Sequence, residues 1–199
     1  LLVMSNYPLS QKDWLLGHVR PMLGNGDPLW KYMKNYHEYI GRLGYLLSLG
    51  KPGIRTAVYY PVKDIWAGGS EFESVCSSHD ELVKELLDNQ CDFDFIDDDV
   101  LEDELTEISD GELLVGPMSY DVVCVSRNRH MSEKSLSKLG RFINSGGKVL
   151  WVNSTSFGNR PDGAVISTLS DLPSRLAPLI SLKRPNNNIR ACKRVLEEG

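Results

Sequence analysis

Residues Tyr39–Pro61, YIGRLGYLLSLGKPGIRTAVYYP, decide the fold class of this chain. The first half is typical of the end of a long amphipathic helix. Gly50 and Pro52 are typical of its stop, and Ile54–Tyr60 of a buried β-strand. This strand leads into PVKDIWAGG, which we interpret as a loop. Because ligands of open α/β sheets bind just beyond such strand ends, the stretch also indicates where a site would lie.

The composition is that of an ordinary globular protein, with 41% hydrophobic and 25% charged residues among 199. The formal net charge of −5 argues against a nucleic-acid partner. No apolar run is long enough for a membrane span, so we expect no membrane partner. Cys76, Cys91, Cys124 and Cys192 form no CxxC pair, and this favours a reducing, cytoplasmic setting.

Further elements follow from apolar spacing and from capping and turn residues. We predict helices over 28–48, 81–89 (opened by a capping box at Ser78–Glu81) and from Ser132 to Gly146, and a short helix or turn over 97–104. We predict strands over 54–60, 91–96, 120–125 and 148–152, and a hairpin turn at Asp110-Gly111. Alternating strands and helices imply right-handed crossovers. The predicted fold is therefore α/β: an open, mostly parallel, flavodoxin-like sheet with helices on both faces and one antiparallel hairpin.

Two units of the pattern echo each other. RLGYLLSLGKPGIRTAVYY and KLGRFINSGGKVLWV both have a helix, a glycine stop, a basic residue and a strand, in that order. We interpret the echo as the order of elements that all αβ units share, and not as a sequence repeat. The expected organisation is a connector or domain tail over 1–26, the α/β domain over 27–185, and a lead-in to a further domain over 186–199. Both ends of the chain are interpreted as cuts in a longer protein.

Several short motifs in order make the chain resemble a known family. They are YIGRLGYLLSLGKPGIRTAVYYPVKDIWAGG, LLDNQCDFDFIDDDVL, ISDGELLVGPMSYDVVCV and LGRFINSGGKVLWV. Together they resemble a segment of large bacterial glycoside hydrolases, in particular the α-L-rhamnosidase-like enzymes. In those enzymes the segment is a flavodoxin-like, glutamine-amidotransferase-like domain after the catalytic barrel. It is similar to the so-called trimerisation domain of some β-galactosidases.

The resemblance implies a non-catalytic accessory domain of a glycoside hydrolase acting on plant or bacterial polysaccharides. It would support the catalytic barrel or contribute oligomer contacts. The implied partners are the barrel of the same protein, another copy of the chain, and a carbohydrate. The acid and base carboxylates of such enzymes lie in the barrel, so no catalytic residue is carried over. Whether the chain alone is an enzyme stays open, and no cofactor or metal ion is expected.

The candidate site is a crevice at the predicted strand ends, lined by Trp66, Asp97, Asp98, Arg127, His130, Asn153 and Ser154. A tryptophan can stack on a sugar ring or fill a domain interface. Carboxylates can hold a cation or can stabilise a helix N-terminus. Arg127 and His130, with the neighbouring Arg129, can bind an anion or can be solvated. An independent sugar-binding module built on this crevice is the alternative function. A small hydrolase using Asp97 or Cys124 is a remote third possibility.

Overall fold

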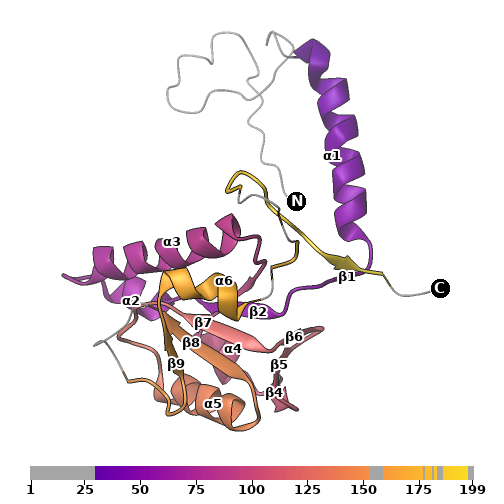
Figure 1. Ribbon diagram of the computed structural model, residues 1–199. Coiled ribbons are helices and arrows are strands. Elements are labelled where there is room, and N and C mark those ends of the chain that lie inside the picture. The colour runs from indigo at the N-terminus through magenta and orange to yellow at the C-terminus, as the bar shows by residue number, and fades with distance from the viewer. Residues whose placement is uncertain (1–29, 153–158, 177, 181, 183–185, 197–199) are drawn as a thin grey trace. The chain divides into compact units, whose positions relative to one another are not determined.

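The computed structural model describes residues 30–152, 159–176, 178–180, 182 and 186–196 (Figure 1). The chain divides into two compact units after Gly50. The predicted connector over 1–26 lies outside the described residues, and the predicted domain boundaries remain predictions.

In the first unit, a short 3-10 helix, Trp30–Tyr32, leads into α1, Met33–Ser48. Gly50 follows the helix with a φ of 59°, a conformation that glycine adopts without strain. The helix therefore ends where the sequence predicts. Its apolar residues recur at steps of three and four, and none of the helix is buried. They are Met33, Tyr36, Ile40, Leu43 and Leu47.

The second unit carries the α/β fold. Its helices are α2 Val62–Ala67, α3 Phe72–Asp88, α4 Asp98–Glu102, α5 Glu133–Asn144 and α6 Leu172–Arg175, with a 3-10 turn at Leu169–Asp171. Its strands are β1 Lys51–Pro52, β2 Thr56–Tyr59, β3 Asp94–Ile96, β4 Thr106–Ser109, β5 Glu112–Val115, β6 Met118–Tyr120, β7 Val122–Val125, β8 Lys148–Val152, β9 Val165–Ser167 and β10 Arg194–Val195.

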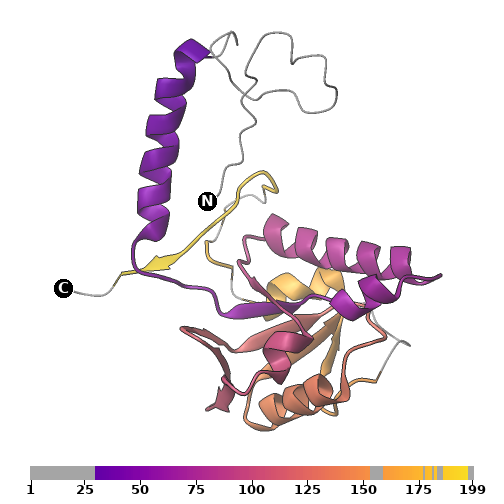
Figure 2. The ribbon, with the colours of Figure 1, turned by 180° about the vertical axis from the view of Figure 1, so that it is seen from behind.

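Five of these strands form a parallel sheet in the order β3-β2-β7-β8-β9. Helices α3 and α6 cover one face, and α4 and α5 cover the other (Figures 1 and 2). Each face has its own apolar core, the first around Val58, Leu82 and Leu150, the second around Tyr59, Phe142 and Trp151. This is the strand order of flavodoxin-like folds, and it confirms the predicted fold class.

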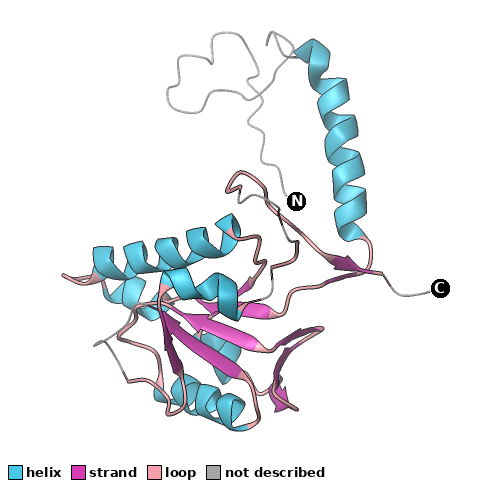
Figure 3. Cartoon of the chain, viewed as in Figure 1, coloured by secondary structure: helices cyan, strands magenta, loops and turns pink. Residues whose placement is uncertain are grey.

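A three-stranded antiparallel sheet, β4-β5-β6, joins α4 to β7 (Figure 3). Its first turn has positive φ at Asp110 (49°) and Gly111 (79°), which confirms the predicted two-residue hairpin. The predicted single strand Tyr120–Val125 is wrong, because the chain changes sheets at Asp121. The Asp121 amide donates to the Arg55 carbonyl (3.0 Å), and its carbonyl accepts from the Lys148 amide (3.0 Å).

One loop prediction and one helix start are wrong. PVKDIWAGG is not a loop, because Val62–Ala67 forms α2 before the positive φ of Gly68 ends it. Helix α3 begins at Phe72, nine residues before the predicted start at Glu81. The capping-box serine, Ser78, lies inside α3, and its hydroxyl accepts a hydrogen bond from the Arg127 amide (3.2 Å). The buried face of α3 therefore also includes Val75 and His79.

Gly147 allows Phe142 to fill the core beneath α5. An added Cβ at Gly147 would overlap the ring of the fully buried Phe142. We therefore expect Gly147→Ala to lower the free energy of unfolding by about 1–3 kcal/mol, the usual cost of overpacking. Urea denaturation would measure it. In Gly147→Ala/Phe142→Leu the smaller side chain should recover part of this loss.

Gly140→Ala provides the matched control, since the nearest atom to an added Cβ there is 3.8 Å away. Within α5 this substitution should raise stability by about 0.5–1 kcal/mol, because alanine favours helix over glycine. Equal effects at the two glycines would contradict the steric explanation.

Candidate functional site

The carboxyl edge of the parallel sheet, where its strands end, is the first place to look for a site. β2 and β7 are neighbours in the sheet. The chain leaves β2 toward α3 on one face, and it leaves β7 toward α5 on the other. Such a divergence creates a crevice in flavodoxin-like folds. Here α2 follows β2, and residues 126–132 follow β7.

Asp64 of α2 fastens the segment after β7. Its side chain is 4% exposed and accepts hydrogen bonds from the backbone amides of Arg129 (2.8 Å) and His130 (3.2 Å). The His130 ring Nδ1 lies 3.0 Å from the same carboxylate. A buried carboxylate needs such donors because burial removes its water. Asp64 is therefore a structural clamp between two strand ends.

Asp98, at the start of α4, forms a second clamp. Its carboxylate accepts from the Tyr59 hydroxyl (3.0 Å), the Ser132 amide (3.1 Å) and the Lys63 ammonium (3.1 Å). Burial alone raises the pKa of Asp98, but hydrogen bonds from Ser135, Ser132, Lys63 and Tyr59 outweigh it, so its pKa lies below the ordinary value. Burial and then Asp98 raise the pKa of Tyr59. These contacts join β2, α4 and the start of α5.

Arg127 and its neighbours are also engaged by the protein. The Arg127 guanidinium donates to Glu71 at 2.9 Å, which links the segment after β7 to the start of α3. Asn128 is 1% exposed and donates to the Ser126 carbonyl at 3.0 Å. Each of these contacts fixes the path of the chain.

The structure places the predicted crevice residues as follows. Asp97 caps α4, with its carboxylate accepting from the Val100 amide at 3.0 Å. Trp66 is 80% exposed on α2. Asp98, Arg127 and His130 make the contacts given above. Asn153 and Ser154 lie outside the described residues. Among the predicted residues that are described, Trp66 is the one that presents most of its surface to solvent.

The environment of Cys124 does not activate its thiol. Cys124 lies within β7 and is fully buried. Burial, with a contribution from Cys91, raises the pKa of its thiol to about 12. Nucleophilic cysteines instead have lowered pKa values. Among the described residues, no three His, Cys, Asp or Glu side chains are placed to hold a metal ion.

His79 is buried beneath aromatic rings at this edge. Its ring meets Tyr60 edge-on with centroids 5.1 Å apart and lies 5.5 Å from Phe95. Its Nδ1 has no hydrogen-bond partner among the described residues. Burial lowers the pKa of His79, and nearby Asp80 opposes this only in part.

His79 should therefore make the fold sensitive to acid. The unfolded chain binds a proton at His79 more readily than the folded chain does. The contribution of His79 to the unfolding free energy is therefore fully present above the unfolded pKa of about 6.5, and it is lost as pH falls through the lower pKa of the folded chain. We expect His79→Leu to flatten the dependence of the unfolding free energy on pH between about 7 and 5. Urea denaturation across this range would measure it. An unchanged slope would contradict the role given to His79.

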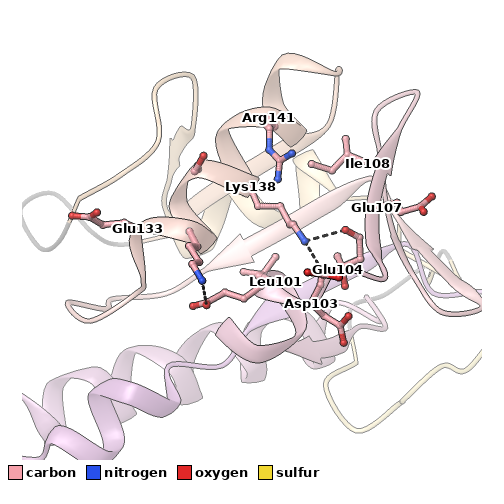
Figure 4. Close-up of a pocket in the computed structure, with 12 residues that line it drawn as sticks. Leu101, Asp103, Glu104, Glu107, Ile108, Glu133, Lys138 and Arg141 are labelled. Atoms are coloured by element: carbon pink, nitrogen blue, oxygen red, sulfur yellow. Dashed lines mark hydrogen bonds and ion pairs between the residues drawn. The ribbon is translucent and has the colours of Figure 1, made fainter.

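A cleft of 940 Å³ lies between α4, β4 and α5 (Figure 4). Lys138 of α5 reaches across it and donates to the carbonyls of Asp103 (2.8 Å) and Thr106 (3.0 Å). The side chains of Glu133 and Glu107 point away toward opposite sides in the same view. Lys138 is 8% exposed, and burial lowers the pKa of its ammonium group. Its contacts tie the antiparallel sheet to α5.

Sequence reasoning missed Asp64, Ser78 and Lys138. Asp64 lay within a segment interpreted as a loop, and its partners come from a strand end 65 positions later. Ser78 was interpreted as a local cap. No sequence signal separates Lys138 from other helix-surface lysines. Apolar spacing through Val75 and His79 is the one signal that would have extended α3 over Ser78.

The fold and the carboxyl edge define a flavodoxin-like α/β domain whose buried carboxylates join its own elements. No protein-family model and no curated protein sequence matches the chain. Among solved structures it is similar to the apo exo-carrageenase GH42 from Bacteroides ovatus, at 13% sequence identity and a TM-score of 0.42. The match covers 61% of this chain and 16% of that enzyme, so it is a partial likeness to a glycoside hydrolase in fold. None of the described helices is suited to crossing a membrane.

Proposed function

We propose that this chain serves as a non-catalytic accessory domain of a glycoside hydrolase and supports its catalytic barrel. One observation carries the proposal. Asp64 and Asp98, the carboxylates buried at the carboxyl edge, accept hydrogen bonds from donors of the domain itself. Carboxylates that act on a glycosidic bond must instead face the substrate. The ordered sequence motifs supply the class of the parent enzyme.

The contact surface of this accessory domain is the apolar side of α1. Tyr36 is 54% exposed and Leu47 is 44% exposed, and they lie on the same stripe as Ile40 and Leu43. A helix with a wide apolar stripe gains most of its stability from packing that stripe against another surface. We assign the catalytic barrel of the same protein as that surface.

The activity test compares this chain with the full open reading frame that contains it, using aryl rhamnosides and aryl galactosides. The full protein should release the aryl group, and the chain alone should not exceed a heat-denatured control. Turnover by the chain itself would contradict the proposal. So would a full protein that cleaves no glycoside.

The contact surface has its own test in the full protein. Leu43→Glu should lower the melting temperature of the catalytic barrel, because it places a charge in the proposed interface. Asn35→Glu makes the same change of charge on the polar side of α1 and is the matched control. Equal melting temperatures for the two variants would contradict the assigned surface.

A further inference from the structure

A second cleft, of 450 Å³, opens at the amino edge of the parallel sheet, where its strands begin. The starts of β2, β7 and β8 form one wall. The described residues that form the other are Arg175, Leu176, Pro178, Leu179 and Lys193. This volume falls within the range of about 300–1,000 Å³ that is usual for small-molecule sites. The cleft lies at the opposite end of the strands from Asp64 and Asp98.

Specific hydrogen bonds hold the wall that follows α6. Gln90, with a φ of 57°, does not line the cleft itself but contacts this segment. The Gln90 side-chain NH2 group donates to the backbone carbonyls of Asn186 and Ile189, each at 3.2 Å, and the Gln90 backbone carbonyl accepts from the Leu179 amide at 3.0 Å. A fixed wall of this kind lowers the entropic cost of binding a ligand.

Lys193 is held in the same way. The Gly53 amide donates to the Lys193 carbonyl at 2.9 Å, and the Lys193 side chain lies so close over Gly53 that an added Cβ would be 2.8 Å from it. Lys193 is exposed overall, but its stem is packed over Gly53, and so less of its rotamer freedom remains to be lost on binding.

The cleft contains cations that form no direct ion pair with a described carboxylate, although Arg175 lies close enough to Asp171 to help lower the pKa of that carboxyl. Arg55 is matched by Glu112 and Asp121. Lys148, Arg175 and Lys193 also line the cleft, but they form no ion pair with any residue that the structure describes. Three such cations stand out in a chain whose net charge is −5. Grouped cations of this kind favour an oxyanion ligand.

The rest of the lining limits what the ligand can be. Leu176 and Leu179 give the cleft an apolar side, and Thr56 contributes a hydroxyl. Asp92 adds a half-buried carboxylate with no ion pair among the described residues. A carboxylate repels a second anion but accepts a hydrogen bond from a hydroxyl. A suitable ligand therefore carries an oxyanion at one end and hydroxyl groups on a carbon framework.

We propose that this amino-edge cleft binds a small hydroxylated organic anion, with Lys148, Arg175 and Lys193 contacting the oxyanion and Asp92 accepting from a hydroxyl. The oxyanion is a carboxylate, a sulfate ester or a phosphate ester, which share this chemistry. The proposal concerns a different part of the domain from the accessory role, and it stands whether or not that role holds.

Titration calorimetry on the intact chain tests the proposal with galacturonate, galactose 6-sulfate, galactose 6-phosphate and neutral galactose. At least one anion should bind, and at least about tenfold more tightly than galactose, since charged hydrogen bonds supply the difference. Which anion binds identifies the oxyanion. Failure of all three anions to bind, or equal affinity for galactose, would overturn the proposal.

Variants locate the site. K148Q/R175Q/K193Q should lose at least about ten times in affinity, whereas K34Q/K84Q/K134Q, with the same change of charge elsewhere, should not. Amide shift mapping on the unaltered chain tests the location without relying on a variant that folds. Shifts should centre on Thr56, Val122 and Leu176. Shifts centred on residues 126–130, or equal losses in the two triple variants, would contradict the assigned cleft.

Discussion

Replacing Asp98 with alanine is expected to lower the free energy of unfolding by about 3 kcal/mol. Two losses dominate. The hydroxyl of the fully buried Tyr59 loses its acceptor, and the Ser132 amide loses its partner at the start of α5. Lys63 contributes less, because its side chain is 39% exposed and water can replace the carboxylate. Urea denaturation at pH 7 would measure the change.

A double-mutant cycle isolates the main contact of Asp98. Tyr59→Phe removes the hydroxyl that Asp98 accepts from, so Asp98→Ala should cost less in that background. Asp99→Ala, on the same helix with an exposed side chain, is the control and should change stability by less than about 0.5 kcal/mol. If the losses of unfolding free energy in Tyr59→Phe and Asp98→Ala simply added, the two side chains would not be coupled, and this would contradict the proposed contact.

The second large effect is expected at Asp64. Asp64→Ala should cost about 2 kcal/mol, because the amides of Arg129 and His130 lose their acceptor. Hydrogen exchange gives the local measurement: these two amides should exchange faster in the variant, while the amides of β7 should keep their protection. Asp64→Asn retains one acceptor oxygen and should restore part of the protection. Unchanged exchange at both amides would show that Asp64 does not hold this segment.

The large-scale fold could be predicted because each signal was local. The Asp110-Gly111 pair gives positive φ at both turn positions, and Ser132 accepts from the Ser135 amide as an N-cap. The strands β2, β7 and β8 are almost wholly buried, and so their sequences are continuous apolar runs. Short-range chemistry of this kind needs no knowledge of distant contacts.

The wrong predictions concern residues whose contacts with distant parts of the chain outweigh their local structural preferences. Ser78 has the spacing of a capping box, but its hydroxyl accepts from Arg127, which comes from the far end of β7. Asp121 interrupts an apolar run because Arg55 and Lys148 bind its backbone on either side. Neither partner is close to these residues in sequence, so spacing alone could not reveal the contacts.

The strand-end positions of four candidate residues could be predicted, but their contacts could not. Asp97, Asp98, Arg127 and His130 do lie at strand ends, as the alternation of strands and helices implies. Their chemistry depends on their partners. The Asp98 carboxylate accepts hydrogen bonds from Tyr59 and Ser132, and only folding brings these residues close to it. The amino-edge cleft follows the same rule, because residues as distant in sequence as Arg55 and Lys193 line it.

The central claim is that the buried carboxylates at the carboxyl edge hold the domain together and do not serve a ligand. The direct measurement is the urea unfolding free energy of Asp64→Asn/Asp98→Asn against the unaltered chain, because asparagine keeps the shape and removes the charge and one acceptor oxygen. We predict a loss of at least about 2 kcal/mol with an unchanged m-value. Carboxylates kept for function are often held at a cost to stability. A double variant as stable as the unaltered chain, or more stable, would contradict the claim.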